Sequence, residues 1–285
     1  MLMIIAILLI LGLCFGSFIN ALVWRTAARD PEVVLPKPNA KLIKAKQGDM
    51  SMATGHSMCT RCYHRLAWYD LVPLLSWLSL KGKCRYCKQP IGRQYPAVEL
   101  LTAVLFVISY LAWPYGFDAS GLLRFGFWLT CLVGLVAMAV YDLRWYLLPN
   151  KFLYPLIGLG VLHALAQVII TGKLAIILST FFSILVAGGI FWVIYQINDN
   201  WIGGGDIKLG VLIGLILMSP DLAFLMLFIA SLIGCIVSIP VLMVKRKYSK
   251  TAQIPFGPFL IAGTLVCLLF GTAIIDWYTG LFLIS

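Results

Sequence analysis

Residues 2–24 read LMIIAILLILGLCFGSFINALVW, a stretch without a single charged side chain. About 20 apolar residues in a helix cross the hydrocarbon core of a bilayer, so this stretch predicts a membrane-spanning helix. It has no basic segment before it and is longer than the apolar part of a secretory signal. We therefore expect it to stay in the protein as the first of its spans.

Similar runs recur along the chain and predict eight spans. Hydrophobic residues make up 61% of the sequence and charged residues 12%, whereas soluble domains have about 45–50% and about 25%. These values exclude a soluble or disordered chain and predict an all-α polytopic membrane protein. The sixth span has an uninterrupted apolar part of only residues 209–218. The expected spans are residues 2–24, 97–113, 121–141, 152–170, 174–197, 201–219, 222–244 and 257–275.

The positive charge indicates how the spans are oriented. The formal net charge is +11, and eight crossings place 20 of the 22 Lys and Arg residues on one side of the membrane. Cytoplasmic loops carry this excess, so that side is expected to face the cytoplasm, with both termini on the opposite side. The predicted organisation is a first helix at 1–24, a cytoplasmic loop at 25–96 and a seven-helix membrane domain at 97–285.

The basic loops also bear on partners. Positive charge beside a bilayer favours contact with anionic lipid headgroups. No nucleic-acid recognition motif accompanies the charge, so we expect a lipid bilayer as partner and no nucleic acid. The localisation that follows is a multi-pass protein of the cytoplasmic (inner) membrane.

Four of the eight cysteines form two C-x-x-C pairs in the loop. They are Cys59, Cys62, Cys84 and Cys87, and the other four lie singly in apolar spans. Two such pairs supply four thiolates to one tetrahedral ion, and closed four-cysteine sites usually hold structural zinc. Two disulfides are the alternative, but the cytoplasm keeps thiols reduced. The pattern therefore favours a structural Zn²⁺ that folds a loop with little hydrophobic core.

Two aspartates lie at the expected cytoplasmic ends of spans. Asp142 ends the third span, and Asp206 opens the sixth after Gly203-Gly204-Gly205. A charge at such a depth is a functional-site hypothesis. Two neighbouring carboxylates share one proton, so one can activate water while the other polarises a peptide carbonyl, as in aspartic proteases. Gly203 and Gly205 lack a Cβ and would let an extended substrate lie close to the backbone.

A plainer interpretation of these residues stays open. Asp142 can pair with Arg144 or Lys151, and Asp206 can pair with Lys208. Carboxylates with shifted pKa values also occur in structural ion pairs, so such values alone do not indicate catalysis. The glycines can simply allow close helix packing.

The sequence resembles the prepilin peptidase family, the type IV prepilin leader peptidases that also serve type II secretion. The resemblance covers most of the chain. Its motifs are Gly16-Ser17-Phe18-Ile19-Asn20 with Arg25, the two C-x-x-C pairs, Pro73 to Leu78 and Lys81 to Arg85, Arg93 to Pro96, Val98-Glu99-Leu100, Asp142 with Pro149, Gly203 to Lys208, and Ile254 to Pro258.

The resemblance implies a membrane aspartyl protease of the G-x-G-D type with Asp142 and Asp206 as catalytic residues. Such enzymes cleave a short basic leader from type IV prepilins and pseudopilins at the cytoplasmic face. Members with the cysteine loop commonly N-methylate the new N-terminus with S-adenosylmethionine. A peptidase without methyltransferase activity, or a non-enzymatic transporter or scaffold with a zinc-stabilised docking loop, are the alternatives.

Residues that bind S-adenosylmethionine cannot be assigned from the sequence. No G-x-G-x-x-G follows a predicted strand, so an ordinary nucleotide-binding fold is not expected. Glu99, at the start of the second span, is the nearest carboxylate candidate for holding a substrate amine. Its alternative role is that of a helix N-terminal acid favoured by the helix dipole.

Overall fold

The fold is all-helical, as the apolar pattern predicts. A computed structural model describes residues 1–33, 56–198, 202–245 and 254–283, and within these ranges it contains helices and two isolated β-bridges but no strand. Part of the predicted loop, residues 34–55, lies outside the described residues. In lipid every backbone N–H and C=O must be satisfied internally, which is why the apolar runs form helices.

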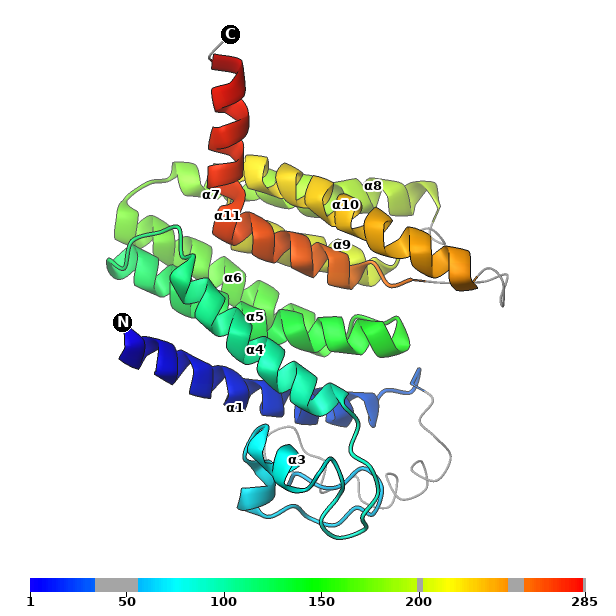
Figure 1. Cartoon of the computed structure of the whole chain (residues 1–285). Coiled ribbons are helices and arrows are strands. Elements are labelled where there is room, and N and C mark those ends of the chain that lie inside the picture. Colours follow the sequence, from blue (N-terminus) through cyan, green and yellow to red (C-terminus); the bar gives the residue numbers. More distant parts are fainter. Residues whose placement is uncertain (34–55, 199–201, 246–253, 284–285) are drawn as a thin grey trace. The chain divides into compact units, whose positions relative to one another are not determined.

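Each of the eight predicted spans coincides with a helix. Within the described residues, seven helices are long and apolar enough to cross a membrane, which makes the chain a multi-pass membrane protein. The helices are α1 (Leu2–Ala27), α4 (Gln94–Leu111), α5 (Ala119–Trp145), α6 (Asn150–Thr171), the continuous α7–η3–α8 (Ala175–Ile184, Leu185–Gly189, Ile190–Ile197), α9 (Gly204–Leu217), α10 (Pro220–Lys245) and α11 (Gly257–Leu283) (Figure 1).

Local sequence signals set several helix ends. Asp118 caps α5 by accepting a hydrogen bond from the backbone N–H of Gly121 at 3.0 Å. Tyr146 and Gly172 end α5 and α6 in the left-handed conformation, with φ of 57° and 68°. Pro220 is the first residue of α10, a position where its missing N–H has no cost.

Helix α9 is the sixth predicted span and is not among the seven long helices. It runs antiparallel to α7–η3–α8: Gly210 packs on Gly188, Gly214 packs on Ile184, and the Ser179 hydroxyl donates to the carbonyl of Met218 at 2.8 Å. Eight of its fourteen residues are buried, and all but one of residues 209–217 belong to this set, as expected of a segment that is apolar on every side. Fourteen residues give a length of about 21 Å.

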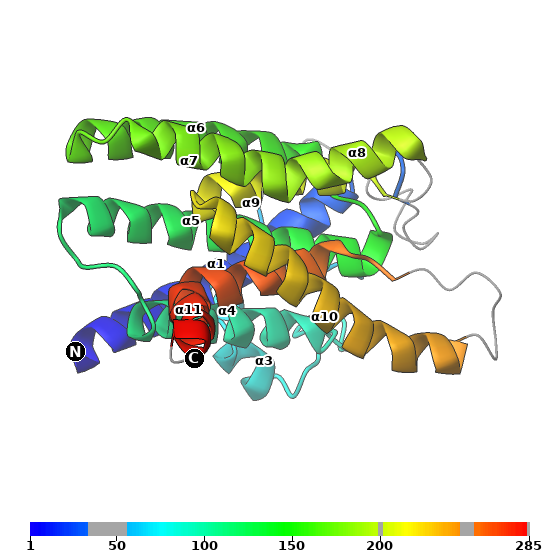
Figure 2. The same cartoon turned by 90° about the horizontal axis from the view of Figure 1, so that it is seen from above.

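The chain forms two compact units, Met1–Leu111 and Ala112–Ser285. In the second unit, α10 and α11 lie side by side, and α5 packs on α6 and α11 (Figures 1 and 2). In the first unit, α1 packs on α4 (Figure 1) and the cysteine loop carries the short η2 (Trp68–Leu71) and α3 (Leu75–Ser79).

Two glycines one turn apart set the α1–α4 contact. A Cβ on Gly12 would lie 2.5 Å from the Cα of Ala103, and one on Gly16 would lie 2.5 Å from the Cα of Glu99. Small residues at this spacing let two membrane helices approach closely. The contact brings Glu99 directly against α1.

Candidate active site and metal centre

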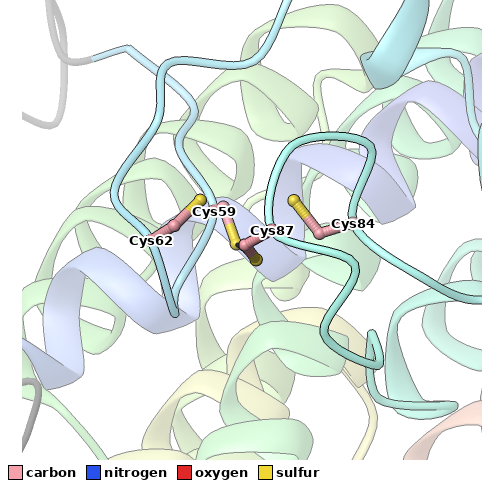
Figure 3. A group of neighbouring side chains, drawn as sticks. All are labelled: Cys59, Cys62, Cys84 and Cys87. Carbon is pink, nitrogen blue, oxygen red and sulfur yellow. Dashed lines mark hydrogen bonds between the residues drawn. The ribbon is translucent and has the colours of Figure 1, made fainter.

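The four loop cysteines form one cluster. The sulfur atoms of Cys59, Cys62, Cys84 and Cys87 all lie within 4.8 Å of one another, so the cluster could hold a metal ion (Figure 3). The Sγ atoms of Cys59 and Cys87 are 3.9 Å apart. Thiolates in a tetrahedral zinc site lie about 2.3 Å from the ion, hence about 3.8 Å from one another. The observed spacing fits such a shell.

The two cysteine pairs are held by equivalent turns. In each turn the N–H of the first cysteine donates to the carbonyl five residues later: Cys59 to His64 at 3.0 Å and Cys84 to Gln89 at 2.8 Å. The residue after each pair, Tyr63 or Lys88, has a φ near 57°. This repeated geometry points both thiols of a pair to the same side of the turn.

Asp70 braces the second cysteine turn. It accepts hydrogen bonds from Nε of Arg85 at 2.8 Å, from the hydroxyl of Tyr86 at 3.0 Å and from the backbone N–H of Ala67 at 3.3 Å. Burial acts to raise the pKa of Asp70, but these donors outweigh it and hold the pKa below its ordinary value. The Asp70 carboxylate is therefore fully engaged in holding the loop.

The second unit brings Asp142 and Asp206 together. Asp142 lies one turn before the end of α5 and is 5% exposed, and Asp206 lies in the first turn of α9 and is half-buried. The two carboxylates interact electrostatically. Asp142 accepts a hydrogen bond from the backbone of Gly257, and Asp206 accepts one from the backbone of Gly203.

Leu148, in the connection between α5 and α6, links the segments that carry the pair. A Cβ on Gly205 would lie 2.9 Å from the Cβ of Leu148, so α9 can begin here only because position 205 is glycine. A Cβ on Gly257 would lie 2.5 Å from Oδ2 of Asp142 and 3.6 Å from Leu148. Both glycines thus permit the close approach that assembles the carboxylates.

The ion-pair interpretation of the two aspartates does not match the structure. Lys208 donates to Oδ1 of Asn150 at 2.7 Å and lies over the ring of Tyr154. Among the described residues, neither Asp142 nor Asp206 takes part in a salt bridge. Two interacting carboxylates without a cationic partner are an expensive arrangement in a membrane domain. Such an arrangement is typical of a functional site.

Glu99 lies in the first unit and is 8% exposed. Its carboxylate accepts hydrogen bonds from the backbone N–H of Leu74 at 2.8 Å and from the side chain of Ser17. Because α4 begins at Gln94 and has no acidic residue in its first turn, the dipole at the helix start does not explain a carboxylate here.

Similarity to known proteins covers both units. Residues 10–113 match the bacterial peptidase A24 N-terminal domain, and residues 129–239 match the type IV leader peptidase family. A Pseudomonas aeruginosa protein named prepilin leader peptidase/N-methyltransferase is 32% identical over 95% of this chain and 91% of its own length. The chain belongs to the type IV leader peptidase family.

Other relatives agree with this membership. A Xanthomonas campestris protein with the same name is 32% identical over 94% of this chain and 92% of its own length. An Escherichia coli protein named type 4 prepilin-like proteins leader peptide-processing enzyme is 32% identical over 88% of each chain. No solved structure matches the chain.

For this member of the leader peptidase family, sequence reasoning gave no role to three residues at the two sites, although two of them, Asn20 and Gly257, lie in motifs of the family resemblance. Gly257 lies against Asp142, and Leu148 packs on Gly205 and Gly257. Asn20 lines the same cavity as Glu99, and its side-chain amide donates to the carbonyl of Tyr95 at 3.0 Å. The segment Ile254 to Pro258 carried a signal in the family resemblance, but nothing in its residue types pointed to Asp142.

Proposed function

We propose that the protein is a membrane aspartyl endopeptidase that removes the short basic leader of type IV prepilins or pseudopilins at the cytoplasmic face. It also N-methylates the new N-terminal residue with S-adenosylmethionine. The observation that carries the peptidase assignment is the pair Asp142 and Asp206, two interacting carboxylates without a salt-bridge partner among the described residues. Names of the relatives that include both activities support the second step.

Peptide hydrolysis at this pair follows the chemistry of aspartic proteases. Two adjacent carboxylates hold one proton between them. The charged aspartate takes a proton from water while the water oxygen attacks the peptide carbonyl carbon, and the protonated aspartate donates to the carbonyl oxygen. The C–N bond then breaks, and the leaving amine takes a proton back from the pair.

Gly203 and Gly205 are proposed to receive the substrate backbone. Gly203 is exposed and is hydrogen-bonded to the Asp206 carboxylate. At Gly203 a substrate strand meets no neighbouring side chain except the Asp206 carboxylate, so its carbonyl can approach Asp206. Gly205 packs against Leu148 and sets the start of α9 beside this position. The substrate is itself a helix with an apolar stretch, and it reaches the site from within the bilayer.

The cytoplasmic orientation rests on the basic loops. The positive-inside rule assigns the side with 20 of the 22 basic residues to the cytoplasm. The antiparallel course of α9 along α7–η3–α8 supports its crossing, because its end at Met218 lies beside Ser179 near the start of α7. Reporter domains fused after residues 220 and 248 are expected on opposite sides. Reporters on the same side would contradict this topology.

The cysteine cluster is proposed to hold structural zinc. Its four thiols match the softness and tetrahedral preference of that ion, and no position is left open for a substrate. The ion then stabilises the fold of a loop whose described residues include few buried side chains.

The experiment that tests the function uses the purified protein and a candidate prepilin, with and without S-adenosylmethionine. Mass spectrometry is expected to find the leader removed in both samples and one methyl group added only with the cofactor. Removal of the leader without methylation would leave a peptidase alone. An unchanged prepilin would overturn the proposed function.

A further inference from the structure

A cavity of about 180 Å³ lies in the first unit, among α1, the cysteine loop and α4. Its lining includes Asn20, Trp24 and Arg25 of α1, Trp77 of the loop, and Tyr95 and Glu99 of α4. The aspartate pair belongs to the other unit, so peptide hydrolysis gives this cavity no role.

The cavity contains a buried carboxyl group that has no cationic partner among the described residues. Glu99 is 8% exposed and takes part in no salt bridge among the described residues. Its two protein donors, the N–H of Leu74 and the side chain of Ser17, are both neutral. Burying a carboxylate is costly unless a cation or several donors compensate it. A positively charged ligand would complete this site.

A second acceptor lies in the same cavity. Asn20 is 5% exposed, and its side-chain N–H₂ group is fixed by the carbonyl of Tyr95 at 3.0 Å. This bond leaves Oδ1 as the buried end of the amide, and Oδ1 has no hydrogen-bond partner in the part of the chain that the structure describes. Buried acceptors in native proteins nearly always have a donor. Asn20 Oδ1 and Glu99 together present acceptors that match the several N–H donors of an ammonium group.

The remaining lining matches the rest of an amino acid attached to a sulfonium. Arg25 is 9% exposed and adds a buried positive charge of the kind that attracts a carboxylate. Trp24 and Trp77 offer aromatic faces, which attract cations. One cavity thus combines groups for an ammonium, a carboxylate and a second cation.

We propose that this cavity binds the amino-acid end of S-adenosylmethionine, with Glu99 and Asn20 accepting from its ammonium group and Arg25 facing its carboxylate. The inference rests on the proposed methyltransferase function and deepens it. A pocket for a complete drug-sized ligand measures about 300–1,000 Å³. At about 180 Å³, the cavity is assigned the amino-acid end and sulfonium, and not the whole cofactor.

The test compares two thioethers that both lack the sulfonium charge and differ in this end. S-adenosylhomocysteine keeps the amino acid, and methylthioadenosine lacks it. Equilibrium binding of both is measured on the purified full-length protein, on Glu99→Gln and Asn20→Leu, and on Glu32→Gln, a matched change at an exposed residue outside the cavity. Thermal unfolding and zinc content of the same samples report whether the unit with the cavity is folded, and leader cleavage reports on the other unit.

The wild type and Glu32→Gln are expected to prefer S-adenosylhomocysteine. Glu99→Gln is expected to lower this preference about 10- to 100-fold, since hydrogen bonds to charged groups have this strength, and Asn20→Leu about 10-fold. If Glu99→Gln is unfolded, Asn20→Leu decides. If the folded variants keep the wild-type preference for S-adenosylhomocysteine, the proposed site is overturned. This holds even if their methylation rate falls, because Glu99 would then act on the amine that receives the methyl group. A wild type that cleaves leaders but binds neither thioether overturns the methyltransferase function itself.

Discussion

Gly257→Ala tests whether the observed position of Asp142 is its catalytic position. The added methyl group would lie 2.5 Å from Oδ2 of Asp142, closer than the 3.0 Å below which real Cβ contacts essentially do not occur. The carboxylate must therefore move by about 0.5 Å or more. A misplacement of about 1 Å costs about 100-fold in rate, so we expect leader cleavage to fall about 10- to 100-fold. The backbone N–H of residue 257 is kept, which makes the perturbation purely steric.

The assay is the initial rate of leader removal from a purified prepilin in detergent or lipid nanodiscs. Gly280→Ala is the control, since it makes the same change in α11 where no atom lies within 4 Å of the new methyl group. The atom displaced in Gly257→Ala is the end of a side chain, so thermal stability is expected to change little. A folded Gly257→Ala protein that cleaves at the wild-type rate would refute the reasoning.

Three further predictions concern the metal centre, the start of α9 and the loop brace. Cys84→Ser is expected to lower bound zinc well below one ion per chain and to abolish methylation, whereas Cys14→Ser, in the first span, leaves the zinc content unchanged; metal analysis checks both. Gly205→Ala is expected to reduce leader cleavage at least about 10-fold because its methyl group meets Leu148 at 2.9 Å. Gly204→Ala, whose methyl group meets nothing within 4 Å, is expected to keep at least half of the wild-type rate. Equal cleavage rates for the two variants would contradict the packing argument. Asp70→Asn is expected to destabilise the cysteine loop near pH 7. Because the pKa of Asp70 is lowered in the folded protein, its stabilising contribution is present above the unfolded pKa of about 4 and is lost as the pH falls through the folded pKa. The melting temperatures of the wild type and the variant should therefore converge in acid.

The helices and the cysteine cluster could be predicted because each depends on a local pattern. The length of an apolar run is enough to predict a span, and all eight predicted spans coincide with helices. The two C-x-x-C pairs predict a single cluster because one tetrahedral ion binds four thiolates. The four sulfur atoms do lie together in the structure. The ends of α5 and α6 follow from left-handed residues that the apolar pattern alone does not mark.

The contacts around the aspartates could not be predicted, because they depend on residues far apart in the chain. Gly257 follows Asp142 by more than a hundred residues, and only the packing of α11 on α5 brings them together. Asn20 in an apolar span resembles many polar residues that face a neighbouring helix. Only the position of α4 shows that the Asn20 amide N–H₂ bonds to Tyr95 and that Oδ1 has no partner among the described residues.

The two units suggest a division between the two proposed activities. The aspartates and the glycines that assemble them belong to Ala112–Ser285, and the cysteine cluster and the cavity with Glu99 belong to Met1–Leu111. Substitutions in one unit should therefore affect one reaction more than the other.

Asp142→Asn and Asp206→Asn provide the most direct measurement. Each purified variant is given two substrates, an intact prepilin and a pilin whose leader has already been removed, together with S-adenosylmethionine. The account predicts no detectable leader cleavage by either variant, with methylation of the pre-cut pilin close to that of the wild type. Normal cleavage by either variant would contradict the assignment of the two aspartates as the catalytic pair.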